Sequence, residues 1–245
     1  MAKRRRSKNY KPSVAARKKK RALPLHQRIF YVALAVVVIG GLFYGMALLT
    51  ERSQPPVSGA AITNPSLLSE NRSFDIVYGR ADAPVTMVEY ASLTCGHCKY
   101  FHEDVVAPIK ARFIDTGKLR FIYRHYPLNK PALQAALLLS CLDSDAERYA
   151  LMKTLFSTQE QWGHSSAHKN QPGALRRLFS SLSDTEYEAC LADKAREKAL
   201  LSEQMQAQKE LGINSTPTIF INEKLYKGRR TAAVLFELIE KYLSH

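Results

Sequence analysis

The residues with the clearest chemical potential are two cysteines separated by two positions, in the run Cys95-Gly96-His97-Cys98. A pair with this spacing can cycle between dithiol and disulfide, form half of a zinc site, or form a structural bridge. A zinc site would need a second ligand pair, whereas the two remaining cysteines, Cys141 and Cys190, are isolated in the sequence. The spacing alone is a weak signal for redox chemistry, and a zinc site and a structural bridge stay as alternatives.

The segments around this run predict how the two sulfurs are held. A short β-rich run, 83–90, precedes Cys95, and a helical pattern extends from Cys98 toward Thr116. Cys95 would then lie at the start of a helix, where free N–H groups and the positive end of the helix dipole stabilise a thiolate. Cys98 can close a ring onto Cys95, and a protonated His97 would lower the thiol pKa further, which makes the pair a better oxidant.

The rest of the chain from residue 74 onward predicts a mixed α/β domain. A strand over 119–123 completes a strand-helix-strand unit with parallel pairing, and the intervening helix is expected to kink at Pro108 and stop at Gly117. A hairpin over 218–226 turns at Asn222-Glu223, and a last helix covers 231–243. Between the second strand and the hairpin the pattern is helical, over 132–142, 146–158, 173–181 and 184–211, with Asp184 as N-cap and Gly212 as stop.

Two motifs together carry a family resemblance. They are Glu89-Tyr90-x-Ser92-x-x-Cys95-x-x-Cys98 and Ser215-Thr216-Pro217-Thr218-Ile219-Phe220-Ile221-Asn222. This combination resembles the DsbA-like branch of the thioredoxin superfamily. The resemblance covers about 74–243 and implies a thioredoxin-like fold over 74–245 with a helical domain inserted at about 128–211.

The resemblance also implies a role for each motif residue. Cys95 would be the exposed nucleophile and Cys98 the resolving thiol, with His97 tuning the pair. Glu89 matches the buried acid that relays the proton of Cys98 in such proteins, although it could instead be an ordinary strand acid turned to solvent. Thr216 and a cis-Pro217 would face the dithiol and dock the substrate chain.

Two histidines and the second cysteine pair are expected to be structural or peripheral. His125 echoes the end of a strand in the family and is expected to be structural, and His102 is expected at the surface. In an exported, oxidising compartment Cys141 and Cys190 are expected to form a structural disulfide, which resembles the second disulfide of some DsbA-like proteins. The alternative is that both are small buried apolar residues.

The N-terminal third predicts a membrane anchor. Residues 1–28 carry 12 Lys and Arg, and 29–50 are 22 residues without charge or proline, long enough to cross a bilayer as a helix. A cleaved signal peptide and a core helix are the alternatives. Residues 51–73 are rich in Ser, Pro and Asn and predict a flexible tether. The basic flank places the N-terminus in the cytoplasm.

The basic tail also accounts for the charge of the chain. The formal net charge is +14, from 36 Lys and Arg against 22 Asp and Glu, but outside 1–28 it falls to +2. A nearly neutral body excludes a global nucleic-acid-binding surface. We therefore expect a monomeric, single-pass protein of a bacterial inner membrane with its folded domain in the periplasm.

Together these patterns predict an oxidoreductase that introduces disulfides into reduced or unfolded exported polypeptides, with no bound cofactor or metal. The resemblance implies a DsbB-like, quinone-linked membrane oxidase as its redox partner. One alternative is an isomerase or reductase that another partner keeps reduced. Another is a membrane-tethered assembly factor that uses the cysteines as metal ligands.

Overall fold

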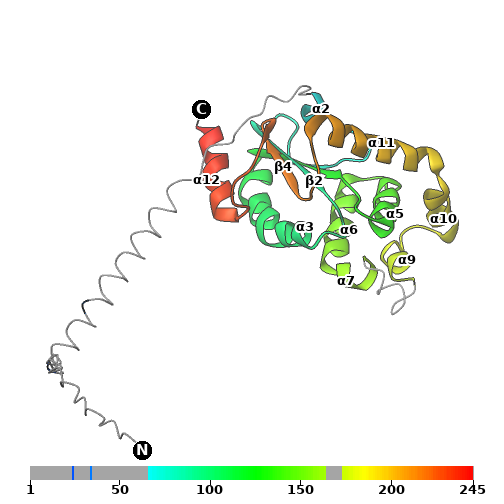
Figure 1. Ribbon diagram of the computed structural model, residues 1–245. Helices are drawn as coiled ribbons and strands as arrows, with labels where there is room; N and C mark the ends of the chain where they lie inside the picture. Colours follow the sequence, from blue (N-terminus) through cyan, green and yellow to red (C-terminus); the bar gives the residue numbers. More distant parts are fainter. Residues whose placement is uncertain (1–23, 25–33, 35–65, 164–172, 245) are drawn as a thin grey trace, which may run out of the picture. The chain divides into compact units, whose positions relative to one another are not determined.

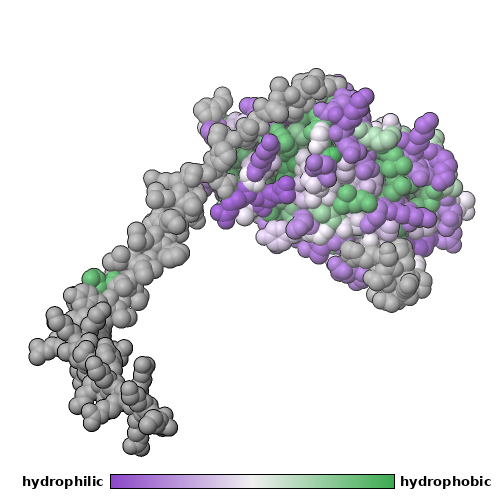
Figure 2. Space-filling view, in the orientation of Figure 1, coloured by the Kyte–Doolittle hydropathy of each residue, from purple (hydrophilic) through white to green (hydrophobic). Residues whose placement is uncertain are grey.

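The structure is a computed structural model that describes residues 24, 34, 66–163 and 173–244. None of the helices within these residues is long and apolar enough to span a bilayer. The basic tail over 1–28 and the anchor expected over 29–50 fall outside the described residues, apart from Pro24 and Leu34. Figure 2 shows hydrophilic side chains over much of the described domain, with hydrophobic patches between them.

A five-stranded sheet forms the centre of the domain, in the order β1-β3-β2-β4-β5. Its strands are β1 (Ile76–Tyr78), β2 (Val85–Ala91), β3 (Leu119–His125), β4 (Thr218–Ile221) and β5 (Lys224–Leu225). β2 and β3 are parallel, as the strand-helix-strand unit predicts, and the other three pairings are antiparallel. β1 is a strand that the sequence pattern does not reveal, because three residues are too few to show an alternation.

A continuous helical segment connects β2 to β3. It comprises α3 (Gly96–Tyr100), η1 (Phe101–Val106), α4 (Ala107–Ile109) and η2 (Lys110–Ile114), where η1 and η2 are π-helical. The expected irregularity at Pro108 therefore takes the form of π-helical turns on either side of the proline. Gly117 follows the segment with φ +73°, a left-handed conformation that lets the chain turn into β3.

The predicted insertion between β3 and β4 is helical throughout its described part. Its helices are α5 (Lys130–Ser140), α6 (Asp145–Ser157), α7 (Gln159–Trp162), α9 (Ala174–Leu178), α10 (Asp184–Ala192) and α11 (Lys194–Leu211). The single helix expected over 184–211 is wrong, because Asp193 ends α10 and caps α11 by accepting from the Arg196 N–H. Ser183, rather than Asp184, caps α10, in a capping box with Glu186.

Alternating residues of the strands send side chains into two cores. Met87, Phe121 and Ile219 belong to one core, whereas Val88 and Phe220 belong to the other. Figure 1 shows α3 and α12 (Ala232–Leu243) on one side of the sheet and α2 (Ser66–Ser69) and α11 on the other. Both faces of the sheet are therefore covered.

A disulfide joins two helices of the insertion. Cys141 follows α5 and Cys190 lies in α10, with an S–S distance of 2.12 Å and a Cα–Cα distance of 6.4 Å. This is the bridge that the sequence leads us to expect. It closes a long loop within the insertion and fixes α10 against α5.

The folded part of the chain begins before residue 74, which corrects the C-terminal end of the tether expected over 51–73. α2 lies within that range, and Leu67 and Leu68 are buried. Burial of Leu68 in the core beside the sheet gives the segment a packing energy that its polar composition does not suggest.

One buried arginine holds this segment to the sheet. Arg124 of β3 makes two hydrogen bonds to the Asp75 carboxylate, of 2.7 and 2.8 Å. It also donates to the carbonyls of Leu67 and Glu70 and to the Tyr90 hydroxyl. Arg124 is 2% exposed, so its charge relies on these partners in place of water.

We predict that Arg124→Met lowers the free energy of unfolding by about 3–5 kcal/mol, because it leaves a buried Asp75 carboxylate without its counter-ion. Urea denaturation measures the change. The double variant Asp75→Asn/Arg124→Met should recover only part of it, since the Leu67 and Glu70 carbonyls still lack their donor. If the free energy of unfolding of Arg124→Met lay within about 1 kcal/mol of the parent value, which is the size of a surface effect, this role would be contradicted.

Candidate active site: a cysteine pair at a helix N-terminus

Cys95 is the N-cap residue of α3. A tight loop after β2 places it there, with the Cys95 N–H donating to the Ser92 carbonyl at 3.0 Å. The N–H of Cys98, one of the groups that a helix leaves free at its start, donates to the Cys95 sulfur at 3.4 Å. The predicted position of this sulfur at a helix N-terminus is confirmed. The expected exposure of Cys95 is wrong, because the residue is only 8% exposed, with the loop at Thr216 against its sulfur.

These contacts lower the pKa of Cys95 to about 5. The largest cause is the hydrogen bond from the Cys98 side chain, and interactions with Thr216 and with the backbone N–H groups of Cys98 and His97 add to it. Partial burial acts in the opposite direction, because it disfavours a charged sulfur. Cys95 is therefore a thiolate at neutral pH when the pair is reduced.

Cys98 has the opposite properties. Its side chain is completely buried, and burial raises its pKa well above the ordinary value, with smaller contributions from the Cys95 hydrogen bond and the Glu89 charge. Cys98 is therefore a neutral thiol at neutral pH. The site thus combines one sulfur prepared to attack with one sulfur that holds its proton.

The loop before β4 reaches the same sulfur from the other side. The Thr216–Pro217 peptide bond is cis, and the Cys95 sulfur lies 3.5 Å from the Thr216 carbonyl oxygen. Pairing of β4 with β2, with Thr218 opposite Tyr90, fixes this proximity. The structure thus brings together both motifs that the sequence analysis relates, and His97 lies exposed on the first turn of α3.

Glu89 is buried in the middle of the sheet. It lies on central strand β2, between Tyr123 of β3 and Ile219 of β4, and none of its surface is exposed. The alternative of a solvent-facing strand acid is therefore wrong. Its negative charge acts on Cys98, as the raised pKa of that thiol shows. Its Oε1 atom has no hydrogen-bond partner among the described residues.

His102 corrects an expectation, because it is not at the surface. Its Nε2 atom lies 2.6 Å from Glu89 Oε2, and only 4% of its side chain is exposed. Its ring stacks on Phe156 of α6 at 4.7 Å and meets Tyr123 edge-on at 5.5 Å. The sequence signal that could have indicated this buried position is the spacing of four residues between Cys98 and His102, which places both side chains on one helix face.

His125 lies buried at the end of β3. Burial, followed by the charge of Arg148, lowers its pKa to about 3, so its imidazole is neutral at physiological pH. Its ring meets that of Tyr123 edge-on at 5.0 Å. These contacts agree with the structural role expected for it.

Gln159 is a site residue that the sequence analysis did not identify. It opens α7, is 1% exposed, and donates from Nε2 to the carbonyls of Leu93 and Cys95, at 2.7 and 3.2 Å. Through this side chain the helical insertion holds the loop that carries the cysteine pair. An isolated glutamine in a helical pattern gives no sequence signal for such a contact.

The domain that carries this cysteine pair is similar to known proteins. Residues 72–241 match the family model described as Thioredoxin. The chain belongs to the thioredoxin family. The crystal structure of a point variant of α-DsbA1 from Wolbachia pipientis is similar to this DsbA-like thioredoxin domain, with 30% identity, a TM-score of 0.67, and coverage of 74% of this chain and 96% of that one. Oxidised BdbD from Bacillus subtilis is similar at 27% identity, with a TM-score of 0.60 and coverage of 70% and 94%.

Curated relatives place the chain in the same DsbA-like group. Disulfide bond formation protein D of Bacillus subtilis is 27% identical over 203 residues, which cover 79% of this chain and 84% of that protein. A Rickettsia typhi protein with a provisional protein-disulfide oxidoreductase name is 30% identical over 177 residues, covering 72% of this chain. The chain spans 64% of that relative and 53–59% of four other rickettsial relatives.

Among the described residues, no group of three or more His, Cys, Asp or Glu side chains is arranged to hold a metal ion.

We predict that reduced Cys95 reacts with iodoacetamide with a pH midpoint near 5, measured by the rate of alkylation and by thiolate absorbance. Cys98 should stay unreactive at neutral pH, which Cys95→Ser tests directly. Because the folded pKa lies below the ~8.5 of a free thiol, the thiolate stabilises the reduced protein above that pH, and the stabilisation is lost as pH falls toward 5. A midpoint near ~8.5 would contradict this assignment, since that is the value of a free thiol.

We predict that Gln159→Leu destabilises the protein by about 1–3 kcal/mol, because two buried carbonyls of the redox loop lose their donor. Thermal unfolding measures the change. Gln161→Leu, the same substitution at an exposed position of α7, is the matched control and should have a smaller effect. Equal effects of the two variants would show that Gln159 does not hold the loop.

Proposed function

We propose that the chain is a thiol-disulfide oxidoreductase that introduces disulfides into exported polypeptides. The observation that carries the proposal is the opposite protonation of two adjacent sulfurs, with the pKa of Cys95 lowered to about 5 and that of Cys98 raised. The names of the similar proteins, which refer to disulfide bond formation and protein-disulfide oxidoreductase, support the same reaction.

The reaction begins with a disulfide between Cys95 and Cys98. A client thiolate attacks the Cys95 sulfur, the Cys95–Cys98 bond breaks, and Cys98 leaves as a thiolate that takes up a proton. A second client thiolate then attacks the client sulfur of the mixed disulfide, and Cys95 leaves as a thiolate. The client loses two electrons and two protons, whereas the enzyme gains two electrons and one proton, and the other proton enters solution.

The low pKa of Cys95 favours oxidation of clients as the direction of this reaction. A stabilised thiolate makes the reduced enzyme more stable and the leaving group better, and both effects make the disulfide a stronger oxidant. The loop with the cis peptide bond at Pro217 lies against the Cys95 sulfur, where Thr216 and Pro217 are proposed to dock the client backbone. His97 is proposed to tune the pair by its charge.

Location and partners form the second part of the proposal, and they rest on the sequence. An uncharged segment over 29–50 after a tail with 12 basic residues favours a single-pass anchor in a bacterial inner membrane, with the catalytic domain in the periplasm. The tether before α2 would keep the domain near the bilayer. We propose that the domain acts as a monomer and that a DsbB-like, quinone-linked membrane protein reoxidises it.

We predict that Cys95→Ser and Cys98→Ser both abolish oxidation of a reduced dithiol peptide, because neither variant can form the Cys95–Cys98 disulfide. With oxidised glutathione as the oxidant, Cys98→Ser should instead accumulate the mixed disulfide at Cys95, because no Cys98 thiol is left to close the ring. Mass spectrometry of acid-quenched samples measures both. Normal turnover by either variant would contradict the mechanism.

The direction of the reaction has its own measurement. Alkylation of the Cys95 and Cys98 thiols in intact cells reports their redox state. A mostly oxidised pair supports oxidation of clients, and a mostly reduced pair would show an isomerase or reductase instead.

A further inference from the structure

The pairing of Glu89 with His102 assigns a path for the proton of Cys98. Each cycle of the proposed function adds one proton to Cys98 and later removes it, yet none of the Cys98 or Glu89 surface is exposed. Water cannot reach either group directly in this arrangement. A buried acid that gives and takes protons must itself exchange them with solvent, so a further group is needed between Glu89 and water.

His102 has the geometry of that group. Its Nε2 atom is 2.6 Å from Glu89 Oε2, while Glu89 Oε1 has no hydrogen-bond partner among the described residues and stays available for exchange with the Cys98 thiol. Imidazole can accept a proton at one ring nitrogen and release another from the second. A purely space-filling residue in this aromatic surrounding, between Phe156 and Tyr123, would not need a nitrogen directed at a buried carboxylate.

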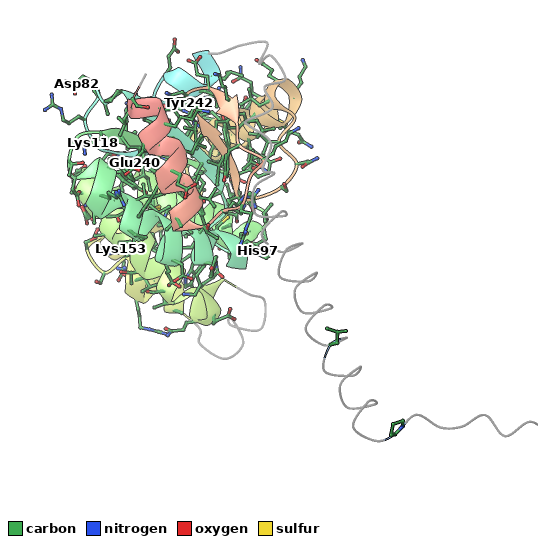
Figure 3. The ribbon with its side chains drawn as sticks, turned by 90° about the vertical axis from the view of Figure 1, so that its left-hand side faces the viewer. Asp82, His97, Lys118, Lys153, Glu240 and Tyr242 are labelled. Carbon is green, nitrogen blue, oxygen red and sulfur yellow. A yellow bond between two sulfur atoms is a disulfide. The ribbon has the colours of Figure 1, made fainter. Side chains whose placement is uncertain are left out.

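A cavity connects His102 with the surface. It has a volume of about 450 Å³ and lies between η1 and α6, with His102 and Phe156 in its wall. The cavity is also lined by exposed residues, namely Glu103, Ala107, Ala150, Lys153, Thr154 and Ser157. Because these residues reach solvent, the cavity provides water with access to the imidazole. Figure 3 labels Lys153, which lines the cavity, and His97, which lies beside the cysteine pair, on opposite sides of the lower half of the domain.

We propose that His102 is a relay residue that passes protons between Glu89 and water in this cavity. When Cys98 is deprotonated, its proton moves to the Glu89 carboxylate, and the carboxyl group passes a proton to Nε2 of a neutral imidazole that carries its own proton on Nδ1. The ring then releases the Nδ1 proton to water in the cavity. When Cys98 leaves as a thiolate, the same steps run in reverse. The proton thus leaves through the wall formed by η1 and α6 and does not cross the face where the client binds.

Further titratable and charged groups surround the Glu89–His102 pair. The other titratable or charged groups around it are Tyr78 of β1, Tyr123 of β3, Cys98 of α3, Glu103 of η1, and Tyr149 and Lys153 of α6. Burial raises the pKa values of Tyr78, Tyr123 and Cys98 well above their ordinary values, so these three stay neutral. Glu103 and Lys153 lie at the exposed mouth of the cavity.

The test isolates the step in which Cys98 must lose its proton, and it rests on the proposed function. Reduced protein is mixed with oxidised glutathione, and acid quenching with mass spectrometry follows first the mixed disulfide at Cys95 and then ring closure by Cys98. His102→Gln keeps an amide nitrogen able to bond Glu89 but cannot relay a proton. His102→Ala opens a space next to the cavity that added imidazole can fill. Lys153→Gln, at the exposed mouth, is the matched control.

We expect ring closure to slow about 100-fold in both His102 variants, the lower end of general acid-base effects, and its rate to rise with pH where the parent rate is flat. Formation of the mixed disulfide should be unchanged, since it depends on Cys95. Imidazole should restore His102→Ala, and Lys153→Gln should close its ring at the parent rate.

Other outcomes overturn the relay. Ring closure at the parent rate in His102→Gln would show that the hydrogen bond to Glu89 is sufficient, and a slow His102→Ala that imidazole does not restore would show a packing role. If the parent protein forms no mixed disulfide at all, the proposed function fails, and that result is distinct from any failure at His102.

Discussion

The Cys98 N–H that points at the Cys95 sulfur is the interaction on which the rest of the site depends. It exists because β2 ends at Ala91 and α3 begins at Gly96, so that the sulfur occupies a position where the helix has donors without helical acceptors. One sulfur then lies at the start of the helix and the other one turn inside it. This helix boundary, together with the hydrogen bond from the Cys98 side chain, makes one cysteine a thiolate and the other a buried thiol.

Burial of the second sulfur has a consequence that the first does not share. A thiol that water cannot reach needs an acid or base inside the protein, and we propose that Glu89 on the central strand, whose charge raises the pKa of Cys98, is that group. The carboxyl group in turn needs a hydrogen-bond partner, and helix periodicity provides one, because His102 lies four residues after Cys98 on the same face. The proposed relay thus uses residues that β2 and the α3–η1 segment bring together.

Local pattern was sufficient to predict the parts of this arrangement that depend on neighbours in sequence. The strand before Cys95, the hairpin at Asn222-Glu223 and the final helix all have clear periodicity or turn residues, and all are present. β1 and α2 were missed because three or four residues show no period. The burial of His102 and the two hydrogen bonds of Gln159 depend on residues far away in sequence, so no local pattern could reveal them.

The helical insertion is a part of the site rather than an addition beside it. α6 provides Phe156, which covers the ring of His102, and forms one wall of the cavity, while α7 provides Gln159 for the redox loop. A thioredoxin fold reduced to its sheet and the α3–η1 segment would leave the Leu93 carbonyl without this donor and His102 without the cover of Phe156. The Cys141–Cys190 disulfide fixes α10 against α5, and α5 packs on α6, so the bridge secures the helix that forms one wall of the cavity at His102.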